Sequence, residues 1–175
     1  MNQNEMMQLY AVAASHCTHF YTAHTRFKTW QKEQWKLDAY QVLASKALHK
    51  FHNVLVRRIH GYDYKKHPDE TEIVMLPTVE VAGSKEGVGQ TVHVHILLGR
   101  LNGKNFNSTD LAEIKSILDD AWLRTDVFGK VTHLEETYKN QELGALMYSD
   151  KGRTKQWFGE GVNFDHCWLP KCLFS

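Results

Sequence analysis

Val92-His93-Val94-His95-Ile96-Leu97-Leu98 is the stretch that decides the fold, and it is an apolar run interrupted by two histidines. Side chains of a strand alternate between its two faces, so His93 and His95 share one face and the aliphatic residues around them share the other. The run therefore predicts a strand over 91–101 with one face in the core. Its other face presents two adjacent imidazoles, a pair that can bind a metal ion.

The segment before this strand predicts its hairpin partner. Residues 73–82 have strand character, and the glycine-rich stretch 83–90 is typical of a turn between antiparallel strands. If Ala82 pairs with Thr91, Glu80 lies opposite His93 and shares its face, whereas a slip of one residue would turn Glu80 away. Glu80, His93 and His95 then form a mixed nitrogen and oxygen site, which suits Mg²⁺ or Mn²⁺ and also accepts Co²⁺, Ni²⁺ or Zn²⁺.

The remaining pattern alternates strands with helices. Apolar spacing and turn residues predict strands over 17–25, 54–59 and 130–135, and helices over 32–51, 109–124 and 140–149, with Ser108 or Thr109 capping the second helix. This order predicts an α+β sandwich, in which helices cover one face of an antiparallel sheet and the other face is free to carry a site.

Length and composition limit the class of protein. With 175 residues, 42% hydrophobic and 23% charged, the chain is expected to form a single domain over 1–175. Three cysteines without a C-x-x-C pair favour a reducing cytoplasm. Residues 1–5 do not resemble the start of a signal peptide, and no apolar run reaches the ~18–20 residues of a membrane span. We therefore expect a cytoplasmic protein and no membrane partner.

A second motif lies near the end of the predicted helix 140–149. Tyr148-Ser149-Asp150-Lys151 places a phenol and an ammonium group one helical turn apart. A free phenol has a pKa of about 10 and is a poor nucleophile at neutral pH, but a nearby Lys⁺ or metal ion favours the phenolate. Gly144 lies one turn before Tyr148, so a strand of DNA could approach the helix closely there. Tyr148 is thus a candidate nucleophile and Lys151 its partner.

Together these residues resemble the HUH endonuclease superfamily. The resemblance rests on Glu80, on the strand around His93 and His95, and on the segment 144–151. It is closest to the single-tyrosine initiators of rolling-circle replication (Rep-like proteins) of plasmids and small phages. A clean first motif is missing around residues 20–25, and Lys151 stands where a two-tyrosine enzyme would need a second tyrosine.

The resemblance implies a ferredoxin-like fold and a specific reaction. Tyr148 would form a 5′-phosphotyrosine link and free a 3′-hydroxyl, with Lys151 assisting by position and charge. His93 and His95 would be ligands of a divalent metal, Mg²⁺ or Mn²⁺, and Glu80 would be the third ligand. The partner would be single-stranded or hairpin DNA at a replication origin in a bacterial or archaeal cell, with the host replication helicase and polymerase as further partners.

Basic residues mixed with tyrosines mark a candidate DNA-binding surface. Tyr62 and Tyr64 lie between two basic pairs, a mixture that suits stacked bases and phosphates. Further cations follow the tyrosine motif. The candidate DNA-binding residues are Arg57, Arg58, Lys65, Lys66, Arg153 and Lys155. A mobile charged loop explains the same composition of residues 57–66 equally well.

Other functions remain open at this level. An HUH transposase or a mobilisation relaxase uses the same chemistry, and a non-catalytic module that binds single-stranded DNA or RNA uses the same sheet. A small-molecule metalloenzyme such as a cupin is a further alternative, because Gly87 and the histidine pair fit the start of a cupin motif. That motif then needs a glutamate where Gly99 and Arg100 stand, and the long helices argue against a barrel. His133 also lies on a predicted strand, where a packed or solvated histidine is the simpler interpretation.

Overall fold

The computed structural model of the chain describes residues 3–29, 34–66, 73–82, 90–137 and 167–169. In chain order these residues form α1 (Gln3–Ser15), β1 (His19–Thr29), α2 (Gln34–His60), the 3₁₀ helix η1 (Tyr62–Lys66), β2 (Val74–Ala82), β3 (Gln90–Gly99), α3 (Leu111–Leu123) and β4 (Phe128–Glu136). The predicted helix 140–149 lies outside the described residues.

The four strands form one antiparallel sheet in the order β2-β3-β1-β4. Two strand–helix–strand units, β1-α2-β2 and β3-α3-β4, are interleaved, so that each unit places a strand of the other between its own two strands. This is the strand order of a ferredoxin-like fold. The predicted α+β class and its antiparallel sheet are confirmed.

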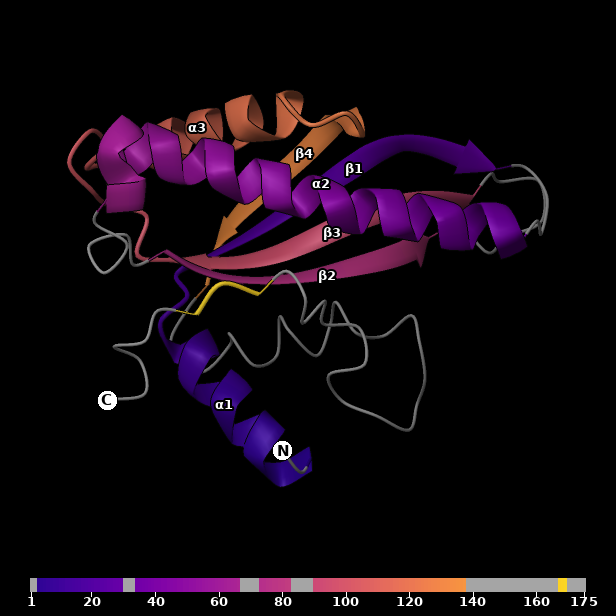
Figure 1. Ribbon diagram of the computed structural model, residues 1–175, viewed down its shortest axis with the longest axis horizontal. Coiled ribbons are helices and arrows are strands. Elements are labelled where there is room, and N and C mark those ends of the chain that lie inside the picture. The colour runs from indigo at the N-terminus through magenta and orange to yellow at the C-terminus, as the bar shows by residue number, and fades with distance from the viewer. Residues whose placement is uncertain (1–2, 30–33, 67–72, 83–89, 138–166, 170–175) are drawn as a thin grey trace.

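Helices α2 and α3 lie together on one face of the sheet (Figure 1). Phe51 of α2, Trp122 of α3 and Tyr21 of β1 are all fully buried there. The Phe51 ring stacks on Tyr21 with 6.0 Å between centroids and meets Trp122 edge-on at 6.1 Å. These three aromatic rings join the two helices to the centre of the sheet.

Helix α2 is longer than predicted, and the strand expected over 54–59 is wrong. Leu48, Phe51, Leu55 and Ile59 are each completely buried, and their spacing places them on one face of a continuous helix. The β-branched residues of this segment have only a weak preference for strands, which the packing of this helical face outweighs. The helix ends at His60 and is followed by Gly61, whose φ of +87° is a left-handed conformation that glycine adopts without strain.

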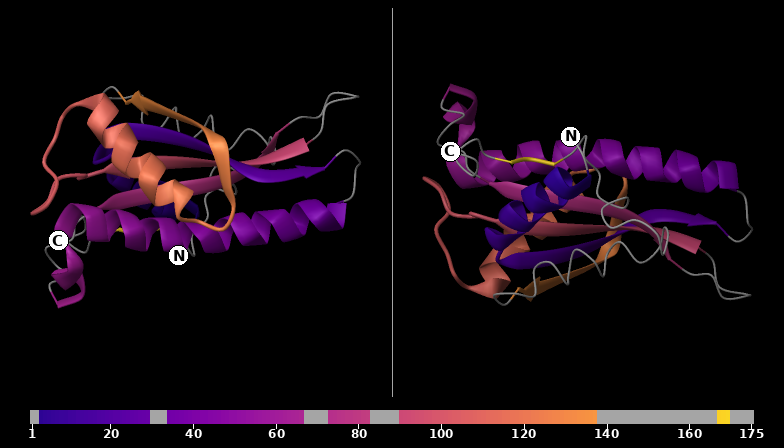
Figure 2. Two further views of the ribbon diagram at one scale, coloured as in Figure 1. Left: turned by 90° about the horizontal axis from the view of Figure 1, so that it is seen from above. Right: turned by 90° about the horizontal axis from the view of Figure 1, so that it is seen from below.

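Helix α1 was not predicted, and it corrects the expectation that all helices share one face. It packs against the opposite face of the sheet from α2 and α3, at one end of the strands (Figure 2). Ala13 and Ala14 are buried there with Val74, Leu76 and Leu97. The face that was expected to be free is therefore covered at one end, and only the remainder of it can carry a site.

The hairpin is present, and so, with shifted ends, are the predicted strands over 17–25 and 130–135 and the predicted helix over 109–124. Ala82 pairs with Thr91 and Glu80 with His93, which confirms the predicted register. Helix α3 is capped by Asp110 rather than by Ser108 or Thr109, because the Asp110 carboxylate accepts hydrogen bonds from the first turn of backbone N–H groups. Among the described residues, no helix is both long and apolar enough to cross a membrane.

Candidate functional site

Three strands bring polar side chains together on the face of the sheet opposite α2 and α3. Val92 and Val94 of β3 are fully buried on the helix side, so His93 and His95 point to the other side. Glu80 of β2 lies directly opposite His93 across the hairpin. The structure therefore brings together the three residues that the sequence predicted as metal ligands.

His95 is held by hydrogen bonds at both ring nitrogens. Its Nε2 lies 2.8 Å from Glu80 Oε2, and its Nδ1 lies 3.0 Å from Thr22 Oγ1 on β1. Phe20 stacks on the same ring, with centroids 5.5 Å apart. Only 7% of His95 is exposed, so these contacts fix the ring in a nearly dry position and leave Nε2 facing the carboxylate.

His93 is arranged differently and has a histidine neighbour that the sequence had not indicated. Its Nε2 lies 2.6 Å from the hydroxyl of Thr91, two residues earlier on β3. Its ring stacks on His24 of β1, with centroids 4.0 Å apart and planes 24° from parallel. His24 was missed because pairing between β1 and β3 joins distant parts of the chain. No local sequence pattern shows which residue of β1 lies opposite which residue of β3.

The environment keeps two of these imidazoles uncharged at neutral pH. Burial, followed by repulsion from His24 and His95, lowers the pKa of His93 to about 4, although Glu80 acts in the opposite direction. Burial also lowers the pKa of His24, with smaller contributions from His95 and Lys28. A neutral imidazole has a free lone pair, which is the form that binds a metal ion.

The side chains of Glu80, His93 and His95 offer the kinds of atom that bind a divalent metal ion, and two of these atoms are also spaced as metal ligands are. Neighbouring ligands of an octahedral ion with bonds of about 2.1 Å are about 3 Å apart. The 2.8 Å between His95 Nε2 and Glu80 Oε2 matches that spacing. Within the described ranges, however, no three His, Cys, Asp or Glu side chains surround one point as ligands do. His93 would have to turn from Thr91 to join the pair.

The partners of His95 also suit coordination. With an ion on Nε2, the other ring nitrogen would carry the proton and donate it to the Thr22 hydroxyl oxygen at 3.0 Å. Metal-bound histidines commonly use their second nitrogen in this way, and the contact orients the ring. Thr22, on β1, is thus a supporting residue that the sequence had not singled out.

The predicted nucleophile and the cations around it lie outside the described residues. This applies to Tyr148 and Lys151 as well as to Arg153 and Lys155. Their roles remain predictions from the sequence.

The other predicted DNA-binding residues lie in the helical layer, not beside the histidines. Arg57 and Arg58 are exposed in the last turns of α2, and Lys65 and Lys66 are exposed in η1. The Arg57 guanidinium lies 5.1 Å from the ring centroid of Tyr62. This arrangement places basic and aromatic groups together, as predicted, but on the opposite side of the sheet from Glu80, His93 and His95.

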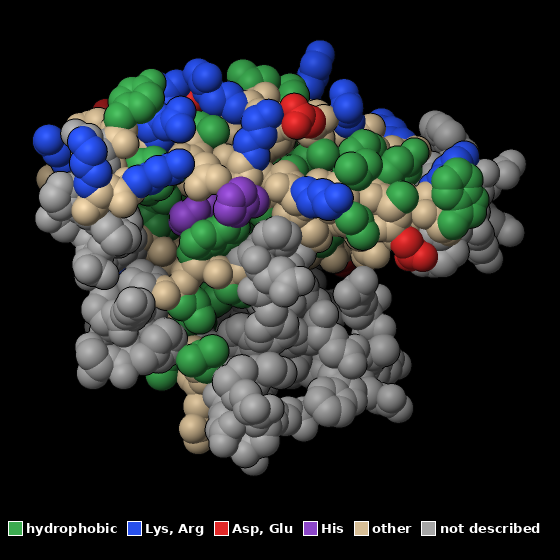
Figure 3. All heavy atoms as spheres, in the orientation of Figure 1, with side chains coloured by type: hydrophobic (Ala, Val, Ile, Leu, Met, Phe, Trp, Pro, Cys, Tyr) green, Lys and Arg blue, Asp and Glu red, His purple; other side chains and the backbone are tan. Residues whose placement is uncertain are grey.

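This basic surface follows α2 further than the sequence had indicated. Residues 34–66 contain seven Lys and Arg against two Asp, although the whole chain has a net charge of only +1. Lys46 is exposed at the middle of the helix and Lys50 about one turn further on, and Lys and Arg side chains gather in the upper part of Figure 3, over the helices. Asp120 pairs with Arg58 at 2.7 Å, and Asp126 pairs with Lys50 at 3.0 Å, so α3 and its following turn neutralise part of this charge.

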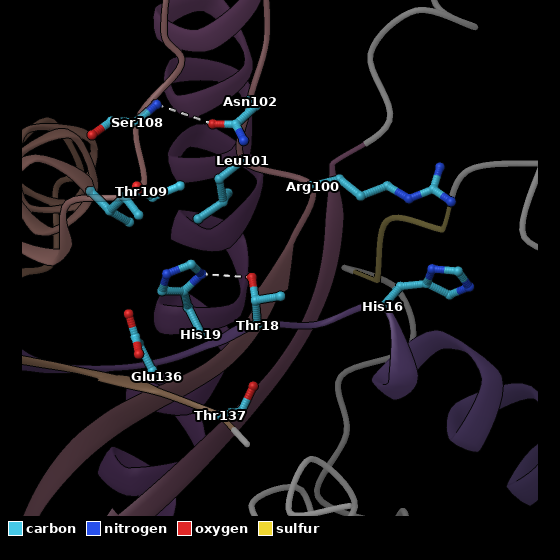
Figure 4. A pocket seen from close by; sticks show the side chains of 11 residues that line it. His16, Thr18, His19, Arg100, Leu101, Asn102, Ser108, Thr109, Glu136 and Thr137 are labelled. Atoms are coloured by element: carbon cyan, nitrogen blue, oxygen red, sulfur yellow. Dashed lines mark hydrogen bonds between the residues drawn. The ribbon is translucent and has the colours of Figure 1, made fainter. Parts of the chain in front are cut away.

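A separate hollow of about 490 Å³ lies at one end of the sheet, near the start of α3 (Figure 4). His19 and Glu136 line it from β1 and β4, and several of its polar groups already bond one another. Thr18 Oγ1 lies 2.8 Å from His19 Nδ1, and Asn102 accepts a hydrogen bond from the Ser108 backbone. The face of the sheet that carries Glu80, His93 and His95 is called the histidine face below. Since His19 lies on the opposite face of β1 from Thr22, this hollow is distinct from the histidine face.

Comparisons of the chain with protein-family models, with curated proteins and with solved structures find no match. Function therefore has to be inferred from the chemistry and geometry of its own residues.

Proposed function

We propose that this protein is a metal-dependent endonuclease that nicks one strand of DNA through Tyr148 and can rejoin it. Such an enzyme would initiate rolling-circle replication of a plasmid or phage. The observation that carries the proposal is the grouping of Glu80, His93 and His95 on the face of a ferredoxin-like sheet opposite α2 and α3, with His95 bonded to Glu80. The residues 144–151 contribute the resemblance to the third motif of HUH endonucleases.

Each residue has a defined part in the proposed reaction. His93, His95 and Glu80 would hold a divalent ion, and what that ion supplies is polarisation of the scissile phosphate. The Tyr148 oxygen attacks phosphorus as its proton departs to a base or to water. The bond from phosphorus to the 3′ oxygen breaks, and that oxygen takes up a proton to become a 3′-hydroxyl. The 5′-phosphate stays on Tyr148, and the reverse reaction rejoins the strand.

Lys151 would raise the fraction of Tyr148 present as phenolate, since a neighbouring positive charge lowers the pKa of a phenol. The basic surface of α2 and η1 would bind the flanking DNA by its phosphates. Because that surface lies on the other side of the sheet from the histidines, DNA bound to both would have to pass around an edge of the sheet.

The decisive experiment is an adduct assay. Purified protein is mixed with a labelled pool of random single-stranded and hairpin oligonucleotides, with Mn²⁺ or with EDTA, and is run on a denaturing gel. We expect a protein–DNA adduct that survives SDS, requires the metal and disappears in Tyr148→Phe. Tyr138→Phe is the matched control, because it removes a hydroxyl from a tyrosine nearby in the sequence and should leave the adduct unchanged.

Two other outcomes would change the assignment. An adduct that persists in Tyr148→Phe would mean that another residue is the nucleophile. DNA binding with no adduct across the pool would favour the second candidate, a non-catalytic module for single-stranded DNA or RNA. The observation that favours this candidate is the partly exposed Phe20 stacked on His95, because aromatic rings on a sheet face can stack on bases.

The same adduct would form in an HUH transposase or a mobilisation relaxase. The sequence recovered from the trapped DNA separates these from a replication initiator. An origin hairpin of a replicating element would support the initiator, whereas transposon ends or a transfer origin would support one of the relatives.

A further inference from the structure

His24 is a third imidazole on the histidine face, and it comes from a different strand. The register of β1 and β3 places His24 directly opposite His93, and Thr22 opposite His95. The stacked rings of His24 and His93, 4.0 Å between centroids, lie beside the His95–Glu80 pair. Two neighbouring strands thus present three imidazoles and β2 adds one carboxylate.

The backbone at His24 is positioned by several independent contacts. β1 is irregular here, since its pairing shifts after His24 on the β3 side and after Ala23 on the β4 side. The His24 carbonyl accepts a hydrogen bond of 3.1 Å from the indole of the buried Trp122, and Thr25 donates one of 2.8 Å to the Val92 carbonyl. Such irregularities re-aim a side chain, and these bonds fix its direction.

β4 also approaches His24 unusually closely. A Cβ atom added to Gly129 would lie 2.5 Å from the His24 carbonyl oxygen, so only glycine fits at that position. The surroundings of His24 are therefore as tightly defined as those of a core residue, although its ring is half-exposed on the polar face.

The nitrogens of the three rings differ in their partners. His95 bonds Thr22 and Glu80, and His93 bonds Thr91, whereas the His24 ring forms no hydrogen bond with any residue of the described part of the chain. The His24 nitrogens are therefore available to an ion. Because the stacked rings of His24 and His93 do not point at one place, and no three such side chains of the described residues surround one point, both rings would have to turn toward His95 and Glu80 for an ion to reach all four.

We propose that His24 is a further ligand of the ion held by Glu80, His93 and His95. A set of three imidazoles and one carboxylate takes a first-row transition ion such as Mn²⁺, Co²⁺ or Zn²⁺ in preference to Mg²⁺. Imidazole nitrogen suits these ions, whereas Mg²⁺ prefers oxygen ligands and retains its water. The inference rests on the metal site of the proposed function but not on Tyr148 or on DNA cleavage.

Metal binding measured without DNA tests this directly. Calorimetric titrations with Zn²⁺, Mn²⁺ and Mg²⁺, and the visible absorption of Co²⁺, are compared for the wild type, His24→Ala and His24→Gln. We expect one ion per chain, binding of Zn²⁺ and Mn²⁺ tighter than that of Mg²⁺, and an affinity at least about tenfold weaker in both His24 variants. The Co²⁺ spectrum should also change, because one nitrogen ligand is lost.

His133→Ala is the matched control. His133 lies on the same face of the sheet, but it is exposed on β4 and its Nε2 pairs with Glu135 at 2.7 Å. Its replacement should leave the affinity and the Co²⁺ spectrum unchanged. Far-UV circular dichroism of each variant reports whether the fold is retained, and His24→Gln keeps a polar side chain in case His24→Ala alters the sheet.

Three results would overturn the inference: no ion bound by the wild type, unchanged affinity and spectrum in both His24 variants, or binding of Mg²⁺ at least as tight as that of Mn²⁺. The adduct assay reports separately on the nickase. A protein that binds a transition ion through His24 but never forms an adduct would refute the nickase and leave this inference intact.

Discussion

Asp119 is the residue that ties α3 to the sheet. Its Oδ1 accepts hydrogen bonds of 3.0 Å from the Tyr21 hydroxyl and 2.7 Å from the Thr132 hydroxyl, while Oδ2 pairs with Lys115. Tyr21 is completely buried, and burial together with the Asp119 charge raises its pKa. One carboxylate thus satisfies a buried phenol and joins two strands to the helix.

Replacing this carboxylate should therefore lower the stability measurably. We expect Asp119→Ala to lose about 1–3 kcal/mol in the free energy of unfolding, because the buried Tyr21 hydroxyl is left without its acceptor. Urea denaturation followed by circular dichroism measures the loss. Asp126→Ala is the control, since its exposed pair with Lys50 should contribute less than about 1 kcal/mol. Equal losses in the two variants would show that the network has no special role.

At the residue scale, the sequence predicted Glu80, His93 and His95 on this face of the sheet, but it did not predict His24 or Thr22. Glu80 could be placed opposite His93 because both strands alternate clearly and a short turn joins them. His24 and Thr22 could not, since they reach the site through pairing of β1 with β3, about 70 residues away in the chain. Side-chain alternation shows which residues of a strand share a face, but not which residue of a distant strand lies opposite.

At the scale of elements, the residue that caps α3 differs between the sequence prediction, Ser108 or Thr109, and the structure, Asp110. Asp110 Oδ1 accepts from the backbone N–H of Ala112 at 2.8 Å and of Glu113 at 2.9 Å. We expect Asp110→Ala to destabilise the protein by about 1 kcal/mol, because two N–H groups of the first turn lose their acceptor. Thr109→Ala, at the predicted cap, should have a clearly smaller effect. Thermal unfolding of both variants measures the difference, and a reversed order would mean that Thr109 caps the helix in solution.

The C-terminal part of α2 shows how composition can mislead a prediction of element type. Val54, Val56 and Ile59 have the composition of a strand, and the prediction gave that composition more weight than the spacing of Phe51, Leu55 and Ile59. Gly61 and the basic last turn of α2 were available as signals of a helix end at residue 60. Helix α1 is a different case, because the start of the chain was considered only as a possible targeting signal.

At the scale of the whole molecule, acid should destabilise the fold through His52. Burial, with a smaller contribution from His49, lowers the pKa of His52 to about 3, and its ring stacks on Trp168 with centroids 4.0 Å apart. The unfolded chain protonates this imidazole below about pH 6.5, whereas the folded chain does not until about pH 3. Between these values the unfolded state binds more protons, so the free energy of unfolding falls as the pH falls.

His52→Phe should flatten this dependence. The substitution keeps an aromatic ring against Trp168 and removes one titrating group, which reduces the slope by up to about 1.4 kcal/mol per pH unit. Urea denaturation at several values between pH 7.5 and pH 4 measures the slope for both proteins. At pH 7.5 His52 is neutral in both states, so that point isolates any effect of packing alone. A slope unchanged by the substitution would contradict the assignment of His52.

The pairing of Trp168 with Met75 has a consequence for how copies of this chain behave toward one another. β2 is an edge strand, and an edge strand with free N–H and C=O groups is a template on which another chain can add. Trp168 occupies both backbone groups of Met75, through bonds of 3.0 Å in each direction. The opposite edge, β4, carries exposed Lys130, Glu135 and Glu136, whose charges discourage the same addition. The chain's own backbone thus pairs with one residue of the β2 edge, and charges line the β4 edge; both features oppose the addition of a second copy.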